Sequence, residues 1–237
     1  MSKVLIVGGG AAGMFASIFA AKNGNEVHVF EKNEKLGKKL FITGKGRCNV
    51  TNACDVEELF QNMVSNEKFM YSSFYGFTNQ DVMDFFENAG LRLKTERGNR
   101  VFPQSDHASD VIRVLTEELR RKKVRVCLNT KVQEILSDGT KVTGLRWDCH
   151  DTHQKNQVSE YDAVVVACGG MSYPTTGSDG SGFTLCQKLG HTVTELRPSL
   201  IGMTTAEEYI PQLQGLSLKN VTLTVKSGKK TLYSEFG

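Results

Sequence analysis

The chain has 237 residues, of which 39% are apolar and 23% are charged, as in an ordinary folded protein. These proportions exclude a disordered chain, a collagen and a coiled coil. Lysine and arginine exceed aspartate and glutamate by 29 to 26, and the resulting net charge of +3 is too small to indicate a nucleic-acid partner. No run of 18 apolar residues occurs, so we expect no transmembrane helix and no membrane partner.

The N-terminus and the cysteines indicate the compartment. Residues 4–7 are apolar, but this stretch is too short for a signal peptide. The six cysteines form no Cys-x-x-Cys pair, which is consistent with reduced thiols in a cytoplasmic protein. Residues 149–153 read Cys-His-Asp-Thr-His, but no second pair of ligands lies nearby. We therefore expect a cytoplasmic protein without a metal site.

The first half of the chain begins with a strand, a helix and a second strand. Residues 3–8 have the character of a buried strand, residues 11–22 are rich in alanine, and residues 26–30 again have strand character. Residues 32–54 are rich in Gly, Lys, Asn and Thr. This composition predicts an ordered loop without a helix or strand of its own.

Helical spacing follows over residues 56–88, where Thr78 and Asp81 stand at the spacing of a capping box. A further helix is predicted over residues 105–123, because apolar residues recur there at every fourth position. Ser105 is a suitable N-cap for it.

The next segment predicts mainly strands. Those expected to form a small antiparallel sheet are residues 124–128, 131–136, 141–147 and 158–159. Ser137-Asp138-Gly139 predicts a turn within this sheet. Residues 162–167 form a continuous apolar run typical of a parallel sheet, and residues 182–189 predict a helix.

The last forty residues predict a hairpin. Residues 216–225 and 231–236 have strand character, and residues 227–230 supply a turn. A two-stranded hairpin is marginally stable alone. We therefore expect a fragment cut at Gly237, with a cofactor-binding domain over residues 1–197 and the start of an inserted β-rich domain over residues 198–237.

Three glycines carry the clearest functional signal. Gly8, Gly10 and Gly13 have the spacing Gly-x-Gly-x-x-Gly, directly after a strand and at the start of a helix. In this context Gly8 permits a tight turn, Gly10 lets the backbone approach a pyrophosphate, and Gly13 lets helix and strand pack closely. Glu31 ends the second strand, where a carboxylate accepts hydrogen bonds from a ribose and disfavours a 2′-phosphate. This combination predicts an α/β Rossmann-type dinucleotide-binding domain.

The segment after Glu31 favours FAD over NAD. Residues 36–52 combine glycines, the cations Lys45 and Arg47, and the neutral side chains of Asn49 and Thr51. Such a segment offers a second wall to a long cofactor. The alternative is a solvated basic loop, since charged runs usually lie on the surface.

These motifs resemble the aminoacetone-oxidase-like (YhiN-type) family of NAD(P)/FAD-dependent oxidoreductases. The resemblance covers essentially residues 3–237. It rests on the glycine fingerprint and on the following segments: Glu31-Lys32, residues 44–52, Arg100-Val101-Phe102-Pro103-x-Ser105, residues 167–182, Leu189-Gly190-His191 and Arg197-Pro198-Ser199-Leu200. It implies a two-dinucleotide-binding flavoprotein fold. It also implies that the family continues past Gly237 and returns to the cofactor domain with a further glycine-rich segment.

The resemblance also implies the residues that bind FAD. They are Gly8, Gly10, Ala11, Ala12 and Gly13 at the pyrophosphate, Glu31 at the ribose, Lys32, Lys39 and Val132 around the adenine, Gly44, Gly46, Arg47, Cys48 and Asn49 toward the flavin, and Ala167, Cys168 and Gly169 closing over the cofactor. Cys168 departs from the family, which has threonine there. A reactive role for Cys48 is the less favoured interpretation, because an isolated cysteine is usually an inert small side chain.

The implied activity is transfer of hydride or electrons between FAD and a small organic substrate, with NAD(P)H or oxygen as the second redox partner. The sequence identifies no catalytic residue and no oligomeric state. Two alternatives remain: a flavin-dependent tRNA-modifying protein, and a catalytically inactive, truncated cofactor-binding module. The first would require a basic stripe with interleaved aromatic residues, and the sequence shows none outside the expected cofactor loop.

Overall fold

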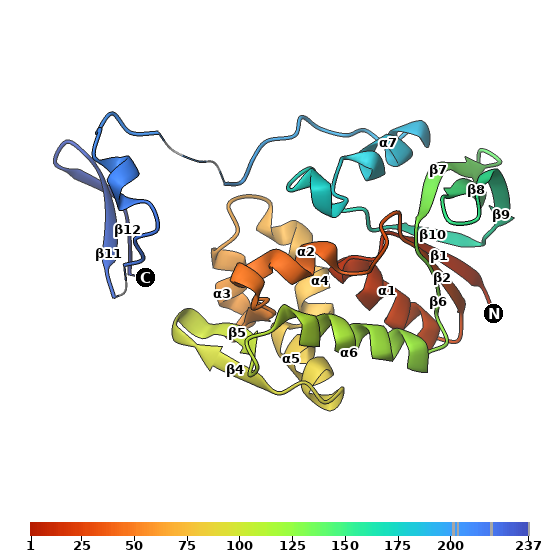
Figure 1. Ribbon diagram of the computed structural model, residues 1–237, viewed down its shortest axis with the longest axis horizontal. Coiled ribbons are helices and arrows are strands. Elements are labelled where there is room, and N and C mark those ends of the chain that lie inside the picture. The colour runs from red at the N-terminus through yellow and green to blue at the C-terminus, as the bar shows by residue number, and fades with distance from the viewer. Residues whose placement is uncertain (201, 203, 219, 237) are drawn as a thin grey trace. The chain divides into compact units, whose positions relative to one another are not determined.

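The computed structural model describes residues 1–200, 202, 204–218 and 220–236 (Figure 1). It contains two compact units, Met1–Val193 and Thr194–Gly237. Gly237, where we expect a cut, lies outside the described residues. The assignment of residues 1–197 and 198–237 to a cofactor domain and an inserted domain stays a prediction.

A parallel sheet forms the centre of the first unit, with the strand order β10-β1-β2-β6. Its strands are β1 (Lys3–Val7), β2 (Glu26–Phe30), β6 (Arg125–Cys127) and β10 (Ala163–Val166). β1 pairs with β2 on one side and with β10 on the other. Helix α1 (Ala11–Lys22) connects β1 to β2, so the predicted strand, helix and strand are present.

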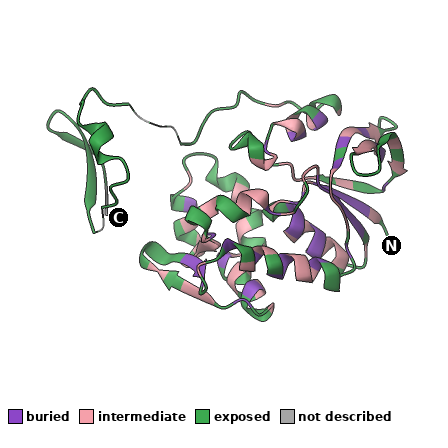
Figure 2. Ribbon diagram, viewed as in Figure 1, coloured by how far each residue is buried: buried purple, intermediate pink, exposed green. Residues whose placement is uncertain are grey.

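Side chains of the central strands alternate between two cores, because successive residues of a strand point to opposite faces. Val4 and Ile6 pack with helices α1 and α6 (Ala108–Arg121). Leu5 and Val7 pack against a second, antiparallel sheet. Burial on both faces explains why these strands are continuously apolar, and Figure 2 shows the buried residues gathered in this region.

The antiparallel sheet that covers the second face contains β7 (Thr130–Ser137), β8 (Val142–Cys149) and β9 (Gln154–Glu160), in that order. Asp138 accepts hydrogen bonds from the backbone N–H groups of Thr140 and Lys141 in the turn between β7 and β8, as predicted for Ser137-Asp138-Gly139. Helix α7 (Ser181–Lys188) follows β10 and contributes Leu185 to the same core.

A smaller antiparallel sheet has the order β3-β5-β4. Its strands are β3 (Thr51–Asn52), β4 (Leu93–Glu96) and β5 (Arg100–Pro103). Residues 56–88 contain three helices, α3 (Val56–Gln61), α4 (Tyr71–Gly76) and α5 (Asn79–Asn88). The capping box at Thr78 and Asp81 is present at the start of α5.

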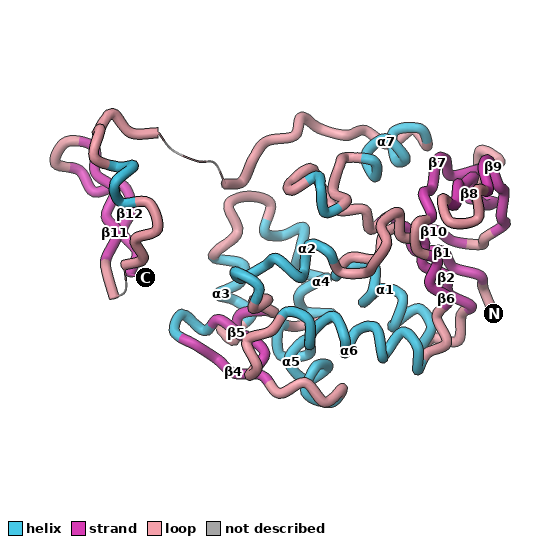
Figure 3. Tube along the Cα trace, viewed as in Figure 1, coloured by secondary structure: helices cyan, strands magenta, loops and turns pink. Residues whose placement is uncertain are grey.

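Three predictions of local structure are wrong. Residues 38–42 form helix α2 (Lys38–Ile42) inside the segment predicted to be a loop (Figure 3), and the end of the same segment forms β3, which pairs with β5. Ser105 does not cap α6, because its hydroxyl donates to Asp110 while His107 occupies the cap position. Residues 124–128 do not join the antiparallel sheet: β6 pairs parallel with β2. A short apolar strand carries no mark of its partner's direction, so pattern alone could not decide this.

The second unit contains the predicted hairpin. β11 (Thr222–Ser227) and β12 (Lys230–Phe236) pair in antiparallel fashion, with a register shift between Val225 and Lys226. The described side chains of β11 are exposed. The described side chains of residues 230–234 in β12 are exposed too, so neither strand buries an apolar face among the side chains that are described.

Candidate functional site

The turn between β1 and α1 depends on two glycines. Gly8 has φ +107°, and a Cβ there would lie 2.5 Å from the carbonyl oxygen of Ala167. A Cβ at Gly13 would overlap the carbonyl oxygen of Gly8. The fold therefore requires glycine at both positions, for backbone conformation at Gly8 and close packing at both.

Gly10 is different, because its surroundings are open. It has φ −81°, which any residue can adopt, and a Cβ there would meet no atom within 4 Å. Gly10 stands at the N-cap of α1, where no side chain makes a capping hydrogen bond. The first-turn N–H groups of a helix lack intrahelical partners and carry the positive end of its dipole. This open space at a helix start has the properties of an anion site.

Glu31 lies beside this turn and is 7% exposed. Its Oε2 accepts a hydrogen bond of 2.6 Å from the backbone N–H of Gly9. Its Oε1 accepts from the backbone and the side-chain amide of Asn33, at 2.8 and 2.7 Å. The carboxylate is thus fixed at the C-terminal end of β2, next to the start of α1.

A cavity of about 560 Å³ opens at this point. It is lined by the ends of β1, β2 and β10, the start of α1, and parts of α2, β7 and α7. Five lysines line it, against the single carboxylate of Glu31: Lys32, Lys35, Lys38, Lys39 and Lys131. The cavity lies at the carboxyl ends of parallel strands, where open α/β sheets bind their ligands. Its charge favours an anionic ligand.

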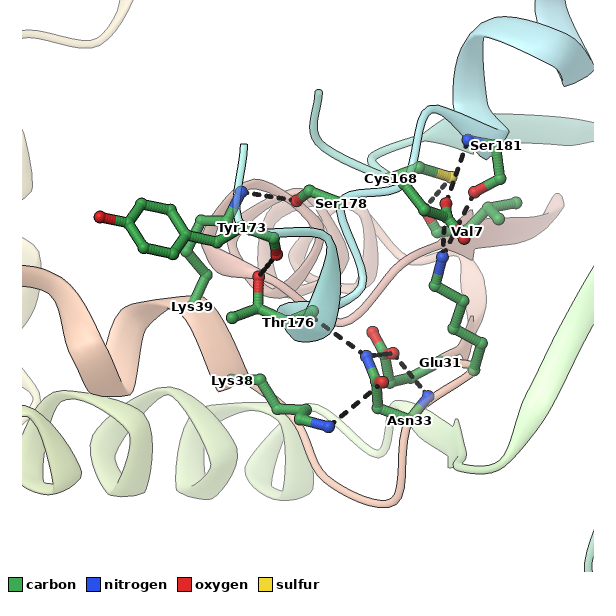
Figure 4. A network of polar contacts seen from close by, with 12 residues as sticks. Val7, Glu31, Asn33, Lys38, Lys39, Cys168, Tyr173, Thr176, Ser178 and Ser181 are labelled. Carbon is green, nitrogen blue, oxygen red and sulfur yellow. Dashed lines mark hydrogen bonds and ion pairs between the residues drawn. The ribbon is translucent and has the colours of Figure 1, made fainter. Parts of the chain in front are cut away.

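A segment after β10, residues 169–181, crosses beside this cavity, and we call it the strap (Figure 4). Lys39 Nζ donates to the carbonyl oxygen of Ser172 at 2.7 Å and to the hydroxyl of Ser178 at 2.6 Å. The side-chain amide of Asn33 donates to the carbonyl oxygen of Thr176 at 3.3 Å. Residues from two distant parts of the sequence are thereby joined at the edge of the cavity.

An ion pair completes these contacts. Lys32 Nζ lies 2.7 Å from Asp179 Oδ1. The hydrogen bond from Lys32 holds the pKa of Asp179 well below its usual range, so this carboxylate is ionised at neutral pH. Part of the lysine charge around the cavity is therefore engaged in holding the strap.

Cys168 forms part of the cavity wall. Its thiol lies 3.6 Å from the carbonyl oxygen of Val7, within hydrogen-bonding distance for sulfur. Burial raises the pKa of Cys168 to about 11. The side chain is therefore a neutral thiol at neutral pH, which makes it a poor nucleophile.

The predicted site residues fall into two groups. Those that line the cavity are Gly8, Gly10, Ala11, Ala12, Glu31, Lys32, Lys39, Val132, Ala167, Cys168 and Gly169. Gly13 lies behind them, packed on Gly8. The others, which do not line this cavity, are Gly44, Gly46, Arg47, Cys48 and Asn49.

The predicted site residues outside the cavity make contacts with other parts of the protein. Arg47 forms ion pairs with Glu96 and Asp106, and its guanidinium lies 4.1 Å from the centre of the Phe102 ring. Cys48 is 1% exposed, and burial raises its pKa, which agrees with an inert side chain. A cofactor role for this group stays a prediction, and the structure gives Arg47 a structural role as well.

Sequence reasoning missed several residues that line the cavity or hold the strap. They are Gly9, Asn33, Lys38, Lys131, Thr176, Ser178 and Ser181. A signal was present for some of them, because residues 176–182 read Thr-Gly-Ser-Asp-Gly-Ser-Gly and open a helix. Asn33 had no such signal, since its role depends on partners more than 140 positions away.

The described residues contain no cluster of three or more His, Cys, Asp or Glu side chains arranged to hold a metal ion. Every helix that the described residues form is too short or too polar to cross a membrane.

The cavity fits the diphosphate and ribose of a dinucleotide. The space beside Gly10 leaves the start of α1 accessible, and the lysines supply positive charge. A carboxylate has about four acceptor sites, and Glu31 uses three of them within the protein. The remaining lone pair, on Oε2, can accept from one ribose hydroxyl. The protein's own hydrogen bonds therefore leave room at Glu31 for one ribose hydroxyl.

Comparisons with known proteins agree with this geometry. Residues 2–231 match the family described as HI0933-like protein Rossmann domain. The 3-dehydro-bile acid delta(4,6)-reductase of Clostridium scindens is 36% identical over 203 residues, which cover 85% of this chain and 47% of that protein. The ribosomal RNA dihydrouridine synthase of Haemophilus influenzae is 28% identical over 239 residues, covering 96% and 55%. The chain thus spans about half the length of these relatives.

A solved structure shows the same fold. The open conformation of a flavocytochrome c3 fumarate reductase matches with a TM-score of 0.57 and 22% identity, over 79% of this chain and 40% of that one. The Rossmann-type α/β fold predicted from the glycine fingerprint is therefore confirmed.

Proposed function

Because the chain belongs to the HI0933-like protein Rossmann domain family, a family of FAD-dependent oxidoreductases, we propose that its cavity binds FAD. The N–H groups at the start of α1, beside Gly10, would hold the diphosphate, and Glu31 Oε2 would accept a hydrogen bond from the adenosine ribose. The single observation that carries this proposal is the open space at Gly10, next to a helix start without a side-chain cap. Gly8 and Gly13 are required by the fold, whereas no packing within the chain requires glycine at position 10.

The chain's own residues bind and orient the cofactor. FAD, when bound, supplies the hydride or electron transfer. The N–H groups at the start of α1 stabilise the diphosphate, and Glu31 fixes the ribose. Lys32 and Lys39 hold the strap beside the cavity through an ion pair and a hydrogen bond. The described residues supply no assignable acid–base group, so the catalytic residues stay unassigned.

We further propose that the whole protein reduces a carbon–carbon double bond in a small organic substrate, with NAD(P)H as the electron donor that is oxidised in exchange. The support comes from the names of two relatives. A delta(4,6)-reductase and a dihydrouridine synthase both yield products with hydrogen added across such a bond. The reductase, which acts on a small molecule, has the higher identity of the two.

A second candidate is a flavin-dependent enzyme that modifies RNA. It is favoured by the dihydrouridine synthase match, which extends over 96% of this chain. This relative concerns ribosomal RNA, whereas the sequence led us to consider tRNA. The lysines of the cavity face the proposed cofactor, and the net charge of +3 is small, so we rank this candidate second.

Spectroscopy of the purified chain tests cofactor binding. We expect a yellow protein, or a colourless protein that becomes yellow with added FAD, and mass spectrometry of the released molecule should identify FAD. A folded protein that binds NAD but not FAD would contradict the proposal. FAD binding without turnover in the longer protein would support the inactive module.

A second measurement separates the two substrate classes. The FAD-loaded longer protein is given NAD(P)H with either a steroid enone or unmodified ribosomal RNA, and NAD(P)H oxidation is followed. Turnover with the enone alone supports the small-molecule reductase. Dihydrouridine formation, together with salt-sensitive RNA binding, would replace it with the RNA-modifying enzyme.

A further inference from the structure

A second cavity, of about 630 Å³, shares Lys35 and Lys38 with the first cavity but is not lined by the glycine turn, and we call it the groove. Its walls are α2 with the segment that precedes it, one face of α6, and the chain around β6. Its lining residues lie within the ranges 35–41, 109–120 and 124–128. β6 ends the sheet order, so the groove borders an edge of the central sheet.

The deep part of the groove is apolar. Leu119 and Val124 are buried, and Ile112, Val126 and Leu128 are half-buried beside them. Its size falls within the range of small-molecule pockets, which are mostly apolar with a few polar groups for orientation. A ligand that fills it must therefore have an apolar body.

The rim of the groove is cationic. Lys35, Lys38, Arg113 and Arg120 line it, and none of the described residues that line it is acidic. Lys38 and Arg113 have carboxylate partners that lie outside the groove. Lys35 and Arg120 form no ion pair with any described residue, so their charges are available to a ligand.

Charge and shape together specify the ligand. An apolar body without charge would leave the rim cations unused, and an inorganic anion would leave the apolar floor exposed to water. A guanidinium can bind a carboxylate through two parallel hydrogen bonds, and Arg120 lines the groove without a partner among the described acidic residues. We propose that the groove is a binding site for an amphipathic carboxylate of the fatty-acid type, distinct from the proposed FAD site.

Fluorescence titration of the full 237-residue chain with cis-parinarate tests this proposal. We expect saturable binding that laurate displaces, whereas dodecyltrimethylammonium, with a tail of the same length and opposite charge, should displace it poorly. Acetate, which has no tail, should not compete. Equal displacement by the cationic surfactant, or the absence of saturable binding, would overturn the proposal. Displacement by FAD would place the probe in the other cavity and overturn it as well.

A matched pair of variants locates the binding site. Arg120→Glu should weaken parinarate binding about tenfold or more, the effect of losing a charge-assisted contact. Lys122→Glu makes the same change of charge two residues later, at an exposed position outside the groove, and should leave binding within about twofold. Equal effects of the two variants would show general charge attraction and would contradict a site in the groove.

Discussion

The Glu31 carboxylate holds the glycine turn as well as facing the cavity, because its Oε2 accepts a hydrogen bond of 2.6 Å from the N–H of Gly9. The acid that ends β2 thereby fixes the backbone that precedes α1. A ribose hydroxyl would bind an oxygen already positioned by the protein. Fold and proposed cofactor site share this one side chain, so a change at Glu31 should affect both stability and binding.

Substitutions of two glycines should separate cofactor binding from folding. We expect Gly10→Val to abolish retention of FAD while the protein stays folded, because the new side chain enters the space proposed for the diphosphate. Gly13→Ala should instead lower the free energy of unfolding by about 1–3 kcal/mol, the usual cost of overpacking. Flavin absorbance and urea unfolding measure the two effects.

Gly76→Val is the control for Gly10→Val, because Gly76 is exposed at the end of α4 and a Cβ there meets no atom within 4 Å. It should leave flavin content unchanged. If Gly10→Val retained FAD as the unchanged protein does, the diphosphate could not lie beside α1.

Glu31→Gln should weaken FAD binding and destabilise the protein together. The glutamine amide keeps one acceptor oxygen, but its NH₂ group replaces the other. In the unchanged protein that second oxygen accepts from an N–H group of Gly9 or Asn33. Leaving a buried donor without its acceptor costs about 1–3 kcal/mol, which urea unfolding would detect. Glu87→Gln, at an exposed position on α5 outside the cavity, should change neither quantity measurably. A stable Glu31→Gln protein with normal FAD affinity would show that the carboxylate has no such double role.

The sequence predicted the part of the site that is local in the chain. Gly8, Gly10, Gly13 and Glu31 lie within one strand-helix-strand unit, where spacing alone determines geometry. The strap could not be predicted in this way, because the contact of Asn33 with Thr176 joins positions 143 apart. The direction of β6 was missed for a related reason, since its partner strand is chosen by tertiary packing.

Acid should weaken the attachment of the strap, because protonation of Asp179 removes its ion pair with Lys32. Lys32 lowers the pKa of Asp179 in the folded protein, so the pair's contribution to stability is present above the unfolded-state pKa of about 3.9. It is lost as the pH falls through the lowered folded-state pKa. Hydrogen exchange of the amides in residues 169–181, corrected for intrinsic rates, should therefore rise in strong acid.

Asp179→Asn is the comparison for this measurement. Its strap should exchange faster at neutral pH and show no further rise that depends on this side chain in acid. Identical exchange in the two proteins at neutral pH would mean that the ion pair with Lys32 does not hold the strap.

The cysteines should differ in their reactivity toward iodoacetamide. A hydrogen bond with Thr152 lowers the pKa of Cys149, whereas burial raises that of Cys168 to about 11 and also raises that of Cys48. The thiolate is the reacting form, so at about pH 8 Cys149 should react roughly tenfold or more faster than Cys168. Peptide mass spectrometry over a time course measures the order. Early alkylation of Cys48 would contradict its inert, buried role and would reopen a reactive role beside the proposed flavin segment.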